Sequence, residues 1–141
     1  MTESWQFWAI LAAIFAALTA IFAKLGVSGI SSNYATFLRT LVVAVALGGL
    51  LWATGGFESL QDVPGRALLF LVLSGLATGA SWLCYFRALQ IGKASQVAPV
   101  DKLSVVFVAI FAALVLGERL SAGGWVGIGL ISAGAVLLAL T

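Results

Sequence analysis

Five continuous apolar runs divide the chain, and short polar segments separate them. Each run approaches the 20 or so apolar residues that a helix needs to cross a bilayer. Apolar and polar positions do not alternate within the runs, which favours helices over the strands of a barrel. The pattern therefore predicts an all-α integral membrane protein with five transmembrane helices over residues 5–23, 34–52, 67–89, 97–116 and 123–140.

The first run has a second interpretation, because a signal peptide is also apolar. A signal peptide needs a basic start, whereas this chain opens with Met1-Thr2-Glu3-Ser4, which contains an acid and no base. We therefore expect the first run to be a helix of the mature protein. Between the last two runs, Gly117 suits a helix end and Ser121 suits a helix start.

Composition agrees with the membrane assignment and excludes several functions. Of 141 residues, 62% are hydrophobic and 9% are charged, which is too few charges to cover a soluble domain. We expect a single domain over residues 1–141, because the five crossings leave no room for a soluble one. Without histidine and with Cys84 as the only cysteine, no Cys/His metal site and no intramolecular disulfide can form. We expect no metal, no cofactor and no nucleic-acid partner, and the absence of catalytic templates predicts that the chain is not an enzyme.

Basic residues near the helix ends predict the orientation in the membrane. The side that carries more Lys and Arg faces the cytoplasm, so we expect the N-terminus outside and the C-terminus inside, in the inner (plasma) membrane. The side shared with the N-terminus holds Arg66 and Arg119, and the opposite side holds Lys24, Arg39, Arg87, Lys93 and Lys102.

Polar side chains inside the third run mark a candidate site. Ser74, Thr78, Ser81 and Tyr85 fall within about 60° of one another at helical spacing, and Trp82 lies at the edge of that stripe. A polar stripe with an aromatic rim is typical of a small-molecule path. The alternative is structural, because Ser and Thr also bond to their own helix or join two helices. Both interpretations remain open.

Three charged residues within the predicted helices, Arg39, Asp101 and Lys102, are the candidates for buried charges. On a continuous helix Asp101 and Lys102 point about 100° apart, so they should pair poorly with each other. We expect Asp101 to meet a cation from another helix, such as Arg39, although Arg39 and Lys102 could instead reach the headgroups. Pro99 fits the first turn of the fourth helix, and a kink or break beside Asp101 is the alternative.

The sequence resembles the EamA-like domain of the drug/metabolite transporter superfamily over essentially its whole length. Tyr34 to Arg39 in the second run is similar to that family. Three further pieces carry the resemblance in the family's order, namely Ala98-Pro99-Val100, Leu116-Gly117-Glu118-Arg119-Leu120, and Gly127 with Gly134 in the last run.

The resemblance implies a five-helix unit, of which larger relatives carry two in opposite orientations around a central cavity. The second unit would come from an antiparallel homodimer or from a partner of opposite orientation. Small multidrug exporters of the superfamily resemble one another in a glutamate within the first helix, and Trp5 to Leu25 contains no carboxylate. Because the charge within the helices is mostly positive, an anionic or zwitterionic cargo is favoured.

The sequence therefore predicts a transporter subunit that moves a small metabolite by alternating access. A non-transporting helper of a membrane complex and a flippase for lipids or lipid-linked cargo are the alternatives. The expected partners are the bilayer, the small-molecule cargo and the second unit. The predicted substrate-binding residues are Ser74, Thr78, Ser81, Trp82, Tyr85, Arg39, Asp101 and Lys102.

Overall fold

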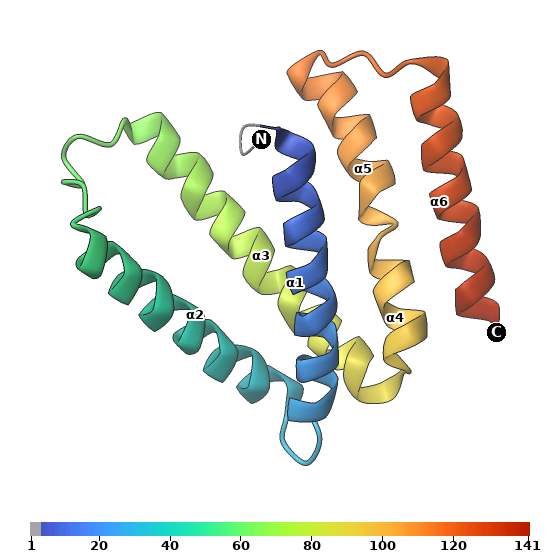
Figure 1. Ribbon diagram of the computed structural model, residues 1–141, viewed down its shortest axis with the longest axis horizontal. Helices are drawn as coiled ribbons and strands as arrows, with labels where there is room; N and C mark the ends of the chain where they lie inside the picture. Colours follow the sequence, from blue (N-terminus) through green and yellow to red (C-terminus); the bar gives the residue numbers. More distant parts are fainter. Residues whose placement is uncertain (1–3) are drawn as a thin grey trace. The chain divides into compact units, whose positions relative to one another are not determined.

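The computed structural model describes residues 4–141, and every regular element in this range is helical (Figure 1). Glu3, which argues against a signal peptide, lies outside the described residues. In chain order the elements are α1 (Trp5–Gly26), α2 (Ser32–Thr54), α3 (Gly65–Ile91), α4 (Ala94–Asp101), α5 (Ser104–Phe111), the π-helical segment η1 (Ala112–Leu116) and α6 (Ala122–Leu140).

Within residues 4–141, five helical stretches are long and apolar enough to cross a bilayer, which confirms the predicted all-α membrane fold. Most helices extend beyond the predicted apolar runs by a turn or less. At α2, capping groups let polar residues join the helix ends. Before α2, the Ser31 hydroxyl accepts a hydrogen bond from the Tyr34 backbone N–H at 3.3 Å, so Ser32 and Asn33 already belong to the helix. After α2, Gly55 adopts φ of 64° and ends the helix.

The start of α6 and the end of η1 follow the predicted capping residues. The Ser121 hydroxyl accepts a hydrogen bond from the Gly124 N–H at 3.2 Å, and Gly117 adopts φ of 70° directly after η1. Both residues therefore do what the sequence predicts. Gly117 is favoured there because a left-handed backbone is costly for a residue that has a Cβ atom.

The fourth stretch is interrupted between α4 and α5, as the alternative interpretation of Pro99 anticipates. At Lys102 and Leu103 the backbone bonds tighten, with the Lys102 N–H donating to the Pro99 carbonyl at 3.1 Å and the Leu103 N–H to Val100 at 3.0 Å. These bonds span three residues instead of the four of an α-helix. The regular helical spacing of side chains therefore does not continue from α4 into α5, and the interruption lies directly after Asp101.

Contacts divide the chain into two compact units, and the prediction of one domain over residues 1–141 stays a prediction. The first unit contains residues 4–24 and 91–141, in which α4 packs along α6 and α5 touches α6 less extensively. Its buried side chains are small, namely those of Ala20, Ala23, Ala109, Ala112 and Ala135. Small side chains let helix backbones approach closely in a membrane protein.

The second unit contains residues 25–90, which include α2 and nearly all of α3. Its most buried side chains lie near the start of α2 and the end of α3, where Leu89 is 0% exposed and Val27 is 2% exposed. Ser32 and Thr36 are buried there too, and the Thr36 hydroxyl donates to the Ser32 carbonyl at 2.9 Å. Burial of the Thr36 hydroxyl is tolerated because the helix backbone accepts its hydrogen bond.

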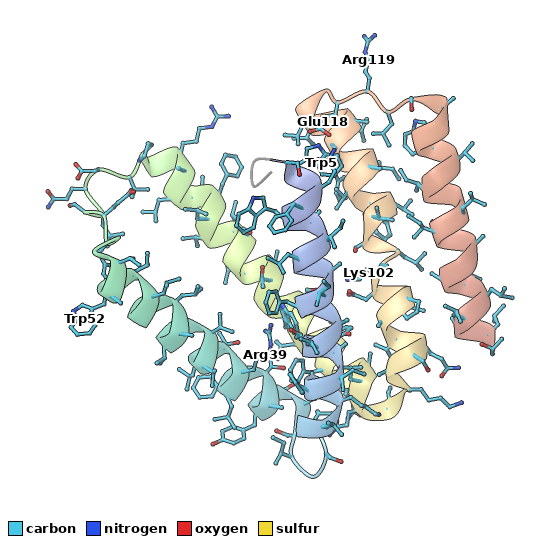
Figure 2. All side chains as sticks on the ribbon, viewed as in Figure 1. Trp5, Arg39, Trp52, Lys102, Glu118 and Arg119 are labelled. Carbon is cyan, nitrogen blue, oxygen red and sulfur yellow. The ribbon has the colours of Figure 1, made fainter. Side chains whose placement is uncertain are left out.

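Most large apolar side chains along the crossing helices are exposed, as expected for surfaces that face acyl chains. Trp52 is 81% exposed near the end of α2, and Trp5 is 74% exposed at the start of α1 (Figure 2). Tryptophan at a helix end suits the membrane interface, where an amphipathic ring meets the headgroups. In water, by contrast, such apolar exposure would promote aggregation.

Candidate substrate-binding site

The predicted polar stripe lies on α3, and its hydroxyl residues are exposed. The Thr78 hydroxyl donates to the Ser74 backbone carbonyl at 2.8 Å, so this hydroxyl is satisfied by its own helix. Ser74 and Ser81 are exposed, while Trp82 and Tyr85 are half-buried. The Thr78 bond is the structural role that the sequence left open, and the assignment of the stripe to cargo stays a prediction.

Arg39 and Trp82 contact each other, which joins two predicted site residues from α2 and α3. The guanidinium carbon of Arg39 lies 3.3 Å from the centroid of the Trp82 ring and above its face. Figure 2 labels Arg39 on the side of α2 that faces α3. A cation over an indole face is attracted by the ring quadrupole, by about 0.5–2 kcal/mol depending on solvent exposure.

Neighbouring aromatic rings hold Trp82 in place. Its ring meets Tyr85 edge-on, with centroids 5.6 Å apart and planes at 80°, and it lies 5.8 Å from the Phe86 ring. Phe86 is only 3% exposed and so anchors the cluster. Edge-to-face packing is a favoured aromatic geometry, so Trp82 offers the Arg39 guanidinium a fixed surface.

The depth of Arg39 along α2 is unusual for a cation. It lies seven residues after Ser32, which places it about 10 Å along the helix at 1.5 Å per residue. It is half-buried, and its guanidinium is held sideways over Trp82. The alternative prediction was that the Arg39 side chain extends to the lipid headgroups. In the structure the guanidinium contacts Trp82 instead.

Asp101 and Lys102 form an ion pair, so the prediction that they pair poorly is wrong. The Lys102 Nζ lies 3.4 Å from the Asp101 Oδ2 (Figure 2 labels Lys102). The prediction assumed one continuous helix, whereas α4 ends at Asp101 and Lys102 belongs to the interruption. Both side chains are exposed, at 61% for Lys102 and 38% for Asp101. A surface pair of this kind contributes about 0–1 kcal/mol, so its carboxylate stays available for other partners.

Two polar contacts that the sequence did not predict tie down helix ends, one in each unit. In the first unit, the Lys24 Nζ at the end of α1 donates to the Gly92 carbonyl at 2.7 Å. In the second unit, Arg87 donates to the Gln90 side chain at 2.8 Å, and Gln90 donates to the Ile30 carbonyl at 3.0 Å. The Lys24–Gly92 and Gln90–Ile30 bonds join segments far apart in the chain, and hydropathy carries no signal for them.

The described residues hold no cluster of three or more metal-ligating His, Cys, Asp or Glu side chains. Cys84 is a free, exposed thiol on α3. The two candidate groups therefore consist of one stacked guanidinium with aromatic neighbours in the second unit and one exposed ion pair at a helix break in the first. The binding of a small molecule by either group stays a prediction.

Five apolar crossings define a multi-pass membrane protein. The chain belongs to the EamA-like transporter family, which matches residues 3–140. A relative from Sinorhizobium sp, described as an uncharacterized transporter in the cobO 3′ region, is 58% identical over 139 residues and covers 99% of both chains. No solved structure matches the chain significantly. The family resemblance seen in the sequence is thus confirmed.

Proposed function

We propose that this chain is one half of a transporter that moves a small anionic or zwitterionic metabolite by alternating access, as a dimer of five-helix units. Membership of the EamA-like transporter family and the relative described as a transporter support the transport role. The observation that carries the cargo class is Arg39, a cation about 10 Å along a crossing helix whose contact is the Trp82 ring. Polar groups at such depth are costly and are typically functional.

The distribution of acids supports an anionic rather than a cationic cargo. Between Trp5 and Gly26, α1 contains no Asp or Glu, so it cannot offer a carboxylate to a lipophilic cation. In the second unit, the acids Glu58 and Asp62 both lie in the loop after α2. The charge that α2 and α3 place within the membrane is therefore positive.

A dimer is proposed because a single unit supplies only one half of the inverted repeat that many transporters use. The exposed hydroxyl stripe of α3 supports a covering partner, since Ser74 and Ser81 are poorly suited to hydrocarbon. An antiparallel second copy or a partner of opposite orientation would cover this surface. We also propose that the protein lies in the inner membrane with its C-terminus in the cytoplasm, because basic residues are in excess on that side.

Asp101 is proposed to orient the cargo or couple transport to an ion. It lies at an interrupted helix, where transporters commonly place binding groups. Its exposed pair with Lys102 can exchange for a cargo group at low cost. The cycle requires binding and conformational change and no chemical step.

Uptake into vesicles that contain the purified protein tests the proposal. Asp101→Asn should abolish uptake of anionic metabolites while membrane insertion stays normal. Glu118→Gln is the matched control, because Glu118 is an exposed acid of the same unit in a turn outside the helices. Normal uptake with Asp101→Asn would remove Asp101 from the mechanism. Failure of the unmodified protein to move any metabolite, together with a stable one-to-one complex in mild detergent, would favour a helper subunit instead.

A further inference from the structure

The distance between Arg39 and Trp82 determines how the guanidinium plane lies. Its central carbon is 3.3 Å from the ring centroid. A guanidinium standing on edge would bring a nitrogen to about 2–2.6 Å from the ring plane, since its C–N bonds are about 1.3 Å long. That separation is far inside van der Waals contact. The guanidinium must therefore lie nearly parallel to the indole ring.

Parallel stacking leaves the hydrogen-bond donors of Arg39 unused. All five N–H bonds lie in the guanidinium plane, so they point sideways from the stack and none of them toward the ring. Among residues 25–90, the guanidinium forms no hydrogen bond and no ion pair. The acids of this unit, Glu58 and Asp62, follow the end of α2, which lies about 22 Å along the helix from Arg39.

From this geometry we infer that Arg39 binds the carboxylate of a small monocarboxylate edge-on, while Trp82 holds the guanidinium face. The inference rests on the proposed function and specifies its substrate class. A carboxylate is planar and offers two oxygens at the spacing of the guanidinium fork, so it accepts two parallel hydrogen bonds. A halide offers a single acceptor atom, so it cannot form the two parallel hydrogen bonds that a carboxylate forms.

Charge balance also favours a single carboxylate. Arg39 contributes one positive charge, and one carboxylate neutralises it inside the membrane. A phosphate monoester carries about −1.5 to −2 charges at neutral pH and would leave negative charge unpaired there. Unpaired charge in hydrocarbon is strongly unfavourable. The site should therefore prefer carboxylates over a phosphate dianion.

Trp82 is a positioning residue in this arrangement. Its packing against Tyr85 and the buried Phe86 fixes the indole, and the indole fixes the plane in which the Arg39 donors lie. A lysine at position 39 would keep the charge but lose both the stack geometry and the two-pronged hydrogen bond. Arg39→Lys therefore separates edge-on recognition from simple attraction of charge.

The test is ligand-dependent thermal stability of the full chain, purified in detergent. Acetate, lactate and benzoate are compared with acetamide, lactamide and benzamide, which keep the shapes but lack the charge. Inorganic phosphate and chloride are included at matched ionic strength. At least one carboxylate should raise Tm where its amide does not, because a ligand of the native state stabilises it. In Arg39→Lys, the concentration needed for the same shift should rise about tenfold or more.

Arg66→Lys is the matched control. The Arg66 guanidinium also faces a ring, that of Phe70, but at 5.9 Å and with an exposed side chain at the start of α3. This variant should keep the carboxylate response of the unmodified protein. If Arg39→Lys does not fold, Arg39→Gln replaces it with the same readout, and the comparison of carboxylate with amide needs no variant.

Several outcomes would overturn the inference: no shift with any of the three carboxylates, equal shifts with the amides, stronger shifts with phosphate or chloride, or an unchanged response in Arg39→Lys. The proposed function fails separately. Binding of a carboxylate through Arg39 without any vesicle uptake would leave the inference standing and remove the transport proposal. Uptake of an anion that is not a carboxylate, without binding of any carboxylate, would leave the transport proposal standing and remove the inference.

Discussion

The Lys24 ammonium at the end of α1 closes the turn between α3 and α4 by donating a 2.7 Å hydrogen bond to the Gly92 carbonyl. The bond is partly buried and joins residues 68 positions apart. A charged donor shortens and strengthens such a bond, and its loss leaves the carbonyl unsatisfied. The contact therefore helps to hold two segments of the first unit together.

We expect Lys24→Met to lower the free energy of unfolding by about 1–2 kcal/mol, because the apolar stem is kept while the donor is lost. Thermal unfolding in detergent measures the effect. Lys93→Met is the control, since Lys93 is an exposed neighbour of Gly92 without a side-chain cap bond. Equal losses in both variants would show that charge at this turn matters rather than the Lys24 bond.

Replacing the indole under Arg39 should impair recognition without removing the cation. Trp82→Leu should weaken apparent cargo affinity by about fivefold to thirtyfold, as expected from loss of a half-buried cation–π contact of about 1–2 kcal/mol. Trp82→Phe should lose less, because it keeps a smaller aromatic face. The measurement is the concentration dependence of vesicle uptake, in which KM should rise more than the maximal rate falls.

Trp52→Leu serves as the control for that comparison. Trp52 is 81% exposed near the end of α2 and does not contact Arg39. Its replacement should leave the KM unchanged. If both leucine variants behaved alike, the loss at Trp82 would reflect a general effect of removing an indole from the membrane.

The proposed orientation predicts where the C-terminus lies. A fluorescent protein fused after Thr141 should fold and fluoresce, whereas alkaline phosphatase fused at the same position should stay inactive, because the C-terminus is expected in the cytoplasm. The reason is the greater number of Lys and Arg residues on that side. Active phosphatase and a dark fluorescent protein would reverse the assignment, and activity of both would indicate that the chain inserts in two orientations.

The helices could be predicted from the sequence because burial in lipid requires continuous apolar runs. Their ends could not be predicted as well, since capping groups rather than hydropathy decide them. Ser32 and Asn33 are polar and still helical, because Ser31 caps the helix before them. The break after Asp101 was signalled only by Pro99, which fits a helix start equally well.

The candidate site could be predicted only in part. Helical spacing correctly grouped Trp82 and Tyr85, since positions three apart on a helix are neighbours. The stack of Arg39 on Trp82 depends on how α2 and α3 align along their length, and periodicity within one helix does not contain that alignment. The Asp101–Lys102 pair was missed because adjacent residues pair poorly on a regular helix, and the helix is interrupted there.

The central claim is that Arg39 receives an anionic cargo that the protein then carries across the membrane. Electrical recording from protein-containing vesicles adsorbed on a solid-supported membrane tests it most directly. A jump from a matched amide to a carboxylate should produce a saturable transient current with the unmodified protein, and Arg39→Gln should abolish that current. A full current with Arg39→Gln would contradict the account. So would the absence of a current from the unmodified protein, together with poor uptake of the same carboxylate.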